Sequence, residues 1–153
     1  MPDAFADLAP RMDFRLPLLL AILLLVAYPA YTDYHARGKT SEVLAALMPA
    51  RAALVRQIGS LPADADLRTL ALPAPDSPWL VTDRPLVLTQ PTTRRVRLAA
   101  RLSGIHPALE QRFLAWEGEL DSGRHSIRWQ CVTDADNTAW RHLPEICRHA
   151  AGT

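Results

Sequence analysis

The reactive side chains of this sequence are not spaced as known enzymes require. It contains neither G-x-S-x-G nor H-E-x-x-H, and no glycine-rich phosphate loop. Glu117, Glu119 and Asp121 are close in sequence, but strand alternation would put them together on a solvent-facing side, where charged groups are ordinarily only solvated. We therefore expect neither a catalytic role nor a cofactor.

The two cysteines, Cys131 and Cys147, are the next candidates for chemistry, with 15 residues between them. His142 and His149 lie nearby, but the four residues match no standard zinc-ligand spacing. A disulfide, which requires an oxidising compartment, is the favoured interpretation. The alternative is a pair of buried thiols in a cytosolic domain.

Four arginines form a candidate basic patch at Arg94, Arg95, Arg97 and Arg101. A single-stranded nucleic-acid surface would interleave such charges with aromatic rings, and no aromatic residue occurs between Trp79 and Phe113. The whole chain has 17 Lys plus Arg against 16 Asp plus Glu, a net charge of +1. An outward strand face kept soluble by charge is favoured over nucleic-acid binding.

The elements that position these residues begin with an apolar run. Leu16 to Thr32 is 17 residues long and carries no charge, which is near the length of a short bilayer span. A buried helix is disfavoured because the run has no polar face, and a cleaved signal peptide because three aspartates lie in the stretch before it. We expect a retained anchor that meets the lipid bilayer through residues 16–34.

An amphipathic helix is predicted to follow over residues 35–59. Apolar residues recur at helical spacing, and Gly59 is a natural end. Pro29 and Pro49 are expected to kink the helix, because each removes one backbone donor. The residues at helical spacing are Leu44, Leu47, Leu54, Val55 and Ile58.

The rest of the chain divides into a loop and strands. Residues 60–93 are proline-rich and predict a connecting loop with short extended pieces at Trp79–Thr82 and Leu86–Thr89. Alternating apolar residues predict three antiparallel strands in residues 94–153, with a hairpin at Asp121-Ser122-Gly123. Their apolar face needs a cover, and the amphipathic helix is the candidate.

This order predicts an α+β fold. A long N-terminal helix, with a membrane half and an amphipathic half, packs on an antiparallel β-meander that ends in a cysteine loop. The segments are a leader at 1–15, the membrane half at 16–34, the amphipathic half at 35–59, the loop at 60–93, and the sheet with the cysteine loop at 94–153.

Two stretches of this chain resemble bacterial type IV pilins. The first is AYPAYTDYHARGKTSEVLAAL, Ala27 to Leu47. The second is the pair IRWQC and LPEICR, which is similar to the disulfide-bounded C-terminal loop of that family. A second proline, as at Pro49, also occurs in some members. The family motif is carried by Pro29, Ala30, Tyr31, Asp33 and Tyr34.

The resemblance implies a structural subunit of a pilus that serves adhesion, twitching motility or DNA uptake. The implied partners are other pilin subunits or the pilus assembly machinery. The implied location is the bacterial inner membrane with a periplasmic C-terminal domain, or the cell surface if the chain polymerises. The Cys131–Cys147 disulfide agrees with this location.

The leader departs from the family pattern. Type IV pilin precursors have Gly before the cleaved bond, then Phe, then a Glu four residues later, whereas here Asp13 precedes Phe14 and Leu18 replaces the Glu. A cleavage site that makes Leu8 the first mature residue does not fit either, because Asp7 then replaces the Gly and Met12 replaces the Glu. We expect residues 1–13 to stay attached. The alternative function is a non-polymerising, membrane-anchored accessory protein that binds pilins or assembly factors.

Overall fold

Two helices precede a sheet in the computed structural model, which describes residues 15–62, 64–121 and 126–151. Helix α1 spans Arg15–Ala46 and α2 spans Met48–Ile58. The strands are β1 (Val87–Thr92), β2 (Arg95–Arg101), β3 (Phe113–Leu120) and β4 (Ile127–Thr133). Short 3-10 turns occupy Leu67–Thr69 (η1), Pro107–Leu109 (η2), Ala139–His142 (η3) and Glu145–Cys147 (η4). The predicted α+β fold is confirmed.

The chain forms two units, one that ends at Thr32 and one that begins at Asp33. The first contains the apolar beginning of α1, whose leucines from Leu16 to Leu25 expose between 51 % and 75 % of their surface. Pro29 lies inside the helix without ending it, and the hydroxyl of Thr32 donates to the Pro29 carbonyl at 2.8 Å. The bend expected at Pro29 stays a prediction.

Pro49 lies next to an interruption of the helical segment, and the kink expected there stays a prediction. It occupies the first turn of α2, where a backbone donor has no partner within the helix, so its missing N–H costs little there. Leu47 joins the two helices in the α-region, at φ −80° and ψ −13°. The Leu47 N–H donates to Val43 O at 3.1 Å, and the Arg51 N–H donates to Leu47 O at 3.0 Å. The helical path therefore continues with one interruption.

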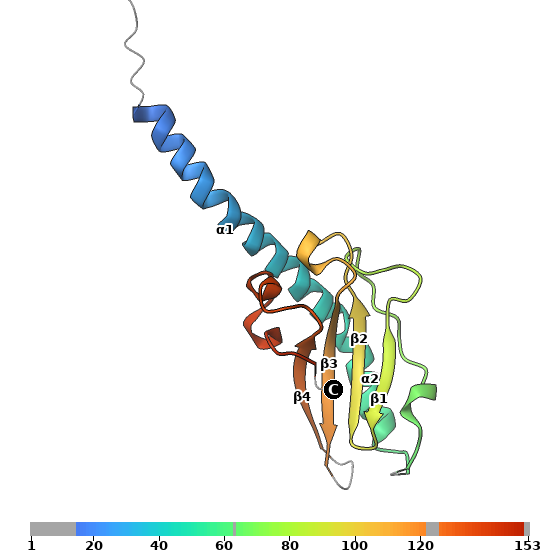
Figure 1. Ribbon diagram of the computed structural model, residues 1–153. Coiled ribbons are helices and arrows are strands. Elements are labelled where there is room, and N and C mark those ends of the chain that lie inside the picture. The colour runs from blue at the N-terminus through green and yellow to red at the C-terminus, as the bar shows by residue number, and fades with distance from the viewer. Residues whose placement is uncertain (1–14, 63, 122–125, 152–153) are drawn as a thin grey trace, which may run out of the picture. The chain divides into compact units, whose positions relative to one another are not determined.

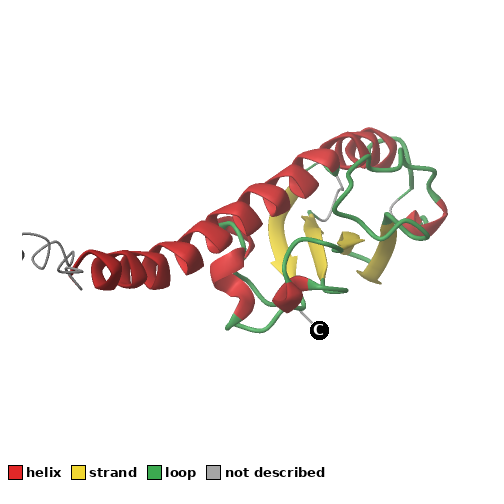
Figure 2. Cartoon of the chain, turned by 90° about the horizontal axis from the view of Figure 1, so that it is seen from above, coloured by secondary structure: helices red, strands yellow, loops and turns green. Residues whose placement is uncertain are grey.

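In the second unit the end of α1 and α2 run along one face of the sheet (Figure 2), and one stripe of their side chains is buried there. Leu47, Leu54 and Ile58 are at most 1 % exposed, whereas Val55 on the opposite side is 43 % exposed. The stripe has the three- and four-residue spacing of an amphipathic helix. α2 ends at Gly59, which adopts φ −62° and so does not use the conformational freedom of glycine. The predicted amphipathic half is confirmed by this burial.

The sheet has four strands in the order β1-β2-β3-β4, each antiparallel to its neighbour. The expected assignment of 60–93 to a loop was wrong for β1, because the short piece at Leu86–Thr89 lengthens into an edge strand paired with β2. Pro91 is tolerated because it lies on the edge, where the register shifts between Thr89 and Thr92. Leu80 forms one isolated bridge with Leu102.

The predicted alternation decides which face of the sheet meets the helices. Val96, Leu98 and Ala100 are fully buried, and Leu114 and Leu120 on β3 face the same side. Gly118 leaves space there: a Cβ would lie 2.8 Å from Ile127 Cγ2 and 2.9 Å from Trp129 Cζ3. Trp116 and Trp129 therefore pack in the same cluster as Leu54 and Ile58 and cover this part of the inner face.

Candidate functional site

The C-terminal cysteine loop is tied to the sheet by a disulfide. Cys131 lies on β4 and Cys147 on η4, their sulfurs are 2.03 Å apart, and both residues are buried. The predicted pairing agrees with this arrangement. Beyond the bond the chain returns along Thr133, whose N–H donates to His149 O and whose carbonyl accepts from the Ala151 N–H, both at 3.0 Å.

The residues enclosed by this disulfide form part of the core. Ala135, Ala139 and Leu143 are at most 5 % exposed and pack in the same cluster as Val43 and Leu47 of the helical segment. Asp136 caps the following turn, and the hydrogen bonds from the Thr138 side chain and the Ala139 N–H lower the pKa of its carboxyl. The loop is therefore packed on the rest of the head rather than appended to it.

A histidine joins the helix motif to the cysteine loop. His142 of η3 is 1 % exposed, and its Nδ1 lies 2.9 Å from Oδ1 of Asp33, the aspartate of the family motif. His106 stacks on His142 with 3.7 Å between ring centroids, and Arg141 Nε donates to His142 Nε2 at 3.3 Å. Because Nε2 accepts from Arg141, these contacts fit a neutral ring protonated at Nδ1, which lies close to Asp33 without hydrogen-bond geometry.

The pKa of His142 is lowered by this environment. Burial disfavours the charged imidazolium, and His106 and Arg141 add positive charge beside it, against the opposing attraction of Asp33. The sequence offered no signal for this cluster, because His142 was weighed there only as a zinc ligand. Of the other motif residues, Pro29, Ala30 and Tyr31 lie in the first unit, and Tyr34 lies in the second.

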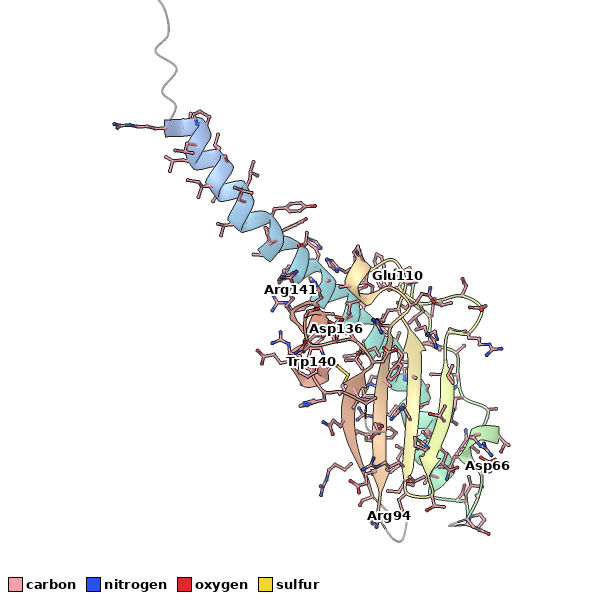
Figure 3. All side chains as sticks on the ribbon, viewed as in Figure 1. Asp66, Arg94, Glu110, Asp136, Trp140 and Arg141 are labelled. Atoms are coloured by element: carbon pink, nitrogen blue, oxygen red, sulfur yellow. A yellow bond between two sulfur atoms is a disulfide. The ribbon has the colours of Figure 1, made fainter. Side chains whose placement is uncertain are left out.

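The four arginines of the candidate basic patch are spread along β2, from Arg94 just before its start to Arg101 at its end, and do not form a free cationic surface. Arg97 faces Glu117 across β2 and β3 and pairs with it at 2.6 Å, with both side chains less than one-fifth exposed. Arg95 is the register partner of Glu119. Arg101 donates to Gln111 O at 3.0 Å, and Arg94, labelled in Figure 3, to Leu120 O at 3.4 Å. Acidic residues on β3 thus offset much of this charge.

A groove of about 650 Å³ opens beside the helix in the second unit, and we call it the Trp79 groove. Trp79 Nε1 donates to Glu42 Oε2 at 2.8 Å, and Lys39 Nζ lies 3.9 Å from the centroid of the indole ring. These two contacts fix the indole against α1. The lining residues are Tyr34, His35, Arg37, Gly38, Lys39, Ser41, Glu42, Trp79 and Pro144. The sequence analysis assigned no role to Trp79.

The described residues include one helical stretch, counted from Arg15 through Ile58, that is long and apolar enough to cross a membrane. None of its most apolar window is buried. An apolar surface of this length is stable only in lipid or against other apolar surfaces. These properties support membrane anchoring of the chain.

Comparison with known proteins gives one informative relative. No family model matches the chain. The chain is 26 % identical, over 136 residues, to a protein named fimbrial protein EcpC from Eikenella corrodens. The match covers 87 % of this chain and 84 % of the relative, so it includes both the helical segment and the sheet. Together with the helix, the antiparallel sheet and the disulfide, it supports a pilus-related structural role in broad terms.

Proposed function

We propose that this chain is a type IV pilin or a pilin-like structural subunit of a bacterial pilus. The observation that carries the proposal is the combination, in one α1 helix, of an exposed apolar beginning and an end packed on a disulfide-closed sheet. The likeness to a fimbrial protein over most of both chains supports the same conclusion. Adhesion, twitching motility and DNA uptake are the activities that such a pilus would serve.

The proposed location is the inner membrane, with the head in the periplasm. Residues 15–32 are helical, which at about 1.5 Å per residue spans close to the hydrocarbon thickness of a bilayer. A disulfide between buried cysteines is stable in an oxidising compartment, and this supports the periplasmic side for the head. The partners would be other pilin subunits and the pilus assembly machinery.

A second candidate function is a non-polymerising accessory protein that binds pilins or assembly factors from the membrane. Leu18, which stands where the resemblance expects a glutamate, is 60 % exposed, and residues 15–32 contain no carboxylate. A carboxylate in an apolar helix is costly unless paired, so a family glutamate would reward correct subunit docking. Because residues 15–32 contain no such glutamate, this chain lacks that contribution to subunit docking. Asp7, Met12, Asp13 and Phe14 lie outside the described residues.

We propose no enzymatic activity, no cofactor and no nucleic-acid partner for this chain. The pairing of Arg97 with Glu117 and the position of Arg95 opposite Glu119 support a solvated, charge-balanced sheet face. A DNA-binding surface would instead leave such arginines unmatched. Filter binding of DNA by the Arg95→Glu/Arg97→Glu double variant tests this: an affinity that falls below that of the wild-type chain would contradict it.

The two candidate functions are separated by where the chain is found. Sheared surface filaments and cell membranes would be probed for the chain in the native host and in a mutant that lacks filament assembly. A filament subunit appears in the sheared fraction of the native host alone, whereas an accessory protein stays in the membrane fraction of both strains. A chain that appears in neither fraction, but in the soluble extract, would contradict both functions.

A further inference from the structure

The Trp79 groove carries positive charge immediately after the proposed membrane span. Arg37 and Lys39 lie on α1 seven residues or fewer beyond Thr32, and both line the groove. Arg37 is exposed, and its Nε donates to the Asp33 carbonyl at 3.3 Å. Within the part of the chain that the structure describes, neither Arg37 nor Lys39 pairs with a carboxylate within 4 Å. Two cations are therefore left without an ionic partner in one groove.

The acidic groups nearby are already occupied. Glu42 directs Oε2 to the Trp79 indole N–H at 2.8 Å, and Asp33 directs Oδ1 to His142 Nδ1 at 2.9 Å. The indole is held on its other side by Lys39, at 3.9 Å from the ring centroid to Nζ. An ammonium has three N–H donors, so Lys39 can contact the ring and still donate toward a ligand. The groove thus offers cations, an aromatic wall and the exposed ring of Tyr34.

We propose that the Trp79 groove binds the headgroup of an anionic phospholipid. This inference rests on the proposed membrane anchoring, and it adds a lipid class and a site to it. Basic and aromatic residues that flank a membrane helix meet the headgroup region, where tyrosine and tryptophan are favoured and lysine and arginine attract phosphate. Arg37 supplies a planar fork for phosphate oxygens and Lys39 a compact charge. A single headgroup is smaller than the groove of about 650 Å³.

The binding would orient the head at the membrane surface before any assembly step. The helix alone fixes how deep the chain inserts, but leaves rotation about the helix axis free. Contacts from the Trp79 groove to anionic headgroups favour one rotation, because Trp79, bonded to Glu42, fixes the direction in which the groove opens from α1. Raising the salt concentration should weaken the preference, since the attraction acts over the Debye length.

Spin-labelled lipids test the proposal on the full-length chain. The protein would be reconstituted in phosphatidylcholine vesicles that contain a small fraction of spin-labelled phosphatidylglycerol or spin-labelled phosphatidylcholine. Electron paramagnetic resonance then reports the fraction of each label that the protein immobilises. We expect phosphatidylglycerol to associate at least about threefold more strongly than phosphatidylcholine with the wild-type chain. The Arg37→Gln/Lys39→Gln variant should lose this preference.

Two further variants keep the test specific. Arg37→Lys/Lys39→Arg preserves both charges and should keep the preference. Arg84→Gln/Arg128→Gln removes the same charge from two exposed positions outside the groove, and should leave the preference unchanged. Inorganic phosphate added to the buffer should not displace the spin-labelled lipid, because a free ion lacks the anchorage of a lipid in the bilayer.

The contrary outcomes separate the lipid site from the proposed function. Equal immobilisation of both lipids by a chain that floats with the vesicles would overturn the lipid site alone, and would direct the search toward an acidic protein segment. A loss of preference in the Arg84→Gln/Arg128→Gln variant would also overturn it, since net charge would then explain the effect. A chain that floats with neither vesicle would overturn the lipid site and the proposed membrane anchoring together.

Discussion

The helical segment meets two environments along its length. From Leu16 to Leu25 the leucines of α1 are exposed by 51 % or more, whereas Leu47, Leu54 and Ile58 are at most 1 % exposed. Both regions are rich in leucine, so residue type alone does not distinguish them. The difference is the distribution: the first has no polar side, and the second places its leucines and Ile58 on one buried stripe. A leucine therefore stabilises the head only where the sheet can cover it.

The sharpest test of this contrast compares one substitution in both regions. Leu54→Ala should lower the unfolding free energy of the head by about 2–5 kcal/mol, because it leaves a cavity between α2 and the sheet. Leu24→Ala, at a position 65 % exposed, should change it by less than about 0.5 kcal/mol. Thermal unfolding of the detergent-solubilised chain, followed by near-ultraviolet circular dichroism, measures both. Equal losses would show that the two regions are not distinct.

The disulfide is the next largest contribution to the head. Cys131 and Cys147 are separated by 16 positions, and a crosslink of this length is worth about 3 kcal/mol in the chain-entropy description. The Cys131→Ser/Cys147→Ser variant should lose this stability while α1 keeps its membrane association. Denaturant unfolding with and without reductant measures the loss, and thiol labelling of the denatured, unreduced wild type should find no free thiol.

A charge placed in the apolar region should affect insertion and spare the head. Leu23→Arg adds a cation near the middle of the proposed span, at a cost of about 2.5–3.5 kcal/mol on insertion scales. We expect most of this variant to be lost from the alkali-resistant membrane fraction. Val55→Arg, at an exposed position of α2, is the matched control and should remain in the membrane. Loss of both variants would indicate a general folding defect.

The burial of His142 beside His106 predicts a pH dependence of the head alone. Because the folded state lowers the pKa of His142 from its ordinary value of 6.5, the unfolded state binds more protons in mildly acidic solution. Stability should therefore fall as the pH drops below about 6.5 and through the folded pKa. Denaturant unfolding between about pH 7 and pH 5 measures the slope. His142→Gln should flatten it, whereas replacement of the exposed His149 should not.

The smallest expected effect comes from the outer face of the sheet. Arg97 and Glu117 pair at 2.6 Å with exposed fractions of 17 % and 14 % for their side chains. A double-mutant cycle of Arg97→Ala and Glu117→Ala should give a coupling of about 0.2–1 kcal/mol, as for cross-strand pairs of opposite charge. A coupling near zero would mean that the pair is only solvated charge.

Much of the fold could be predicted from the sequence because a helix or strand that is buried on one side has apolar residues at regular spacing. The alternation at Val96, Leu98 and Ala100 predicted the inner face of β2. The helical spacing predicted the buried stripe at Leu44, Leu47, Leu54 and Ile58, but was wrong for Val55, which is 43 % exposed. The extended piece predicted at Leu86–Thr89 became part of β1, but its pairing with β2 and its extension past Pro91, which an edge strand with a shifted register allows, were not predicted. Pro49 was predicted to kink the helix; the structure interrupts the helix at Leu47 and places Pro49 in the first turn of α2, and the kink stays a prediction.

The candidate site was less predictable because its contacts join distant segments. Cys131 and Cys147 could be paired by elimination, since two cysteines allow one bond. The stack of His106 on His142, the contact of His142 with Asp33 and the hydrogen bond of Trp79 to Glu42 depend on how loops return to α1. Such contacts leave no periodic pattern in the sequence from which they could be predicted. The arginines near β2 were visible in the sequence, but their pairing with carboxylates on β3 could be found only once the register of the two strands was known.

Cysteine accessibility in spheroplasts tests the central claim most directly. Leu24→Cys and Ser60→Cys each add one thiol, in the apolar beginning of α1 and at an exposed position after α2, while the native disulfide stays closed. With a membrane-impermeant maleimide, the account predicts that Ser60→Cys is labelled in intact spheroplasts, and that Leu24→Cys is labelled only after detergent is added. Labelling of Leu24→Cys without detergent, or of Ser60→Cys only after lysis, would contradict an anchored helix with a periplasmic head.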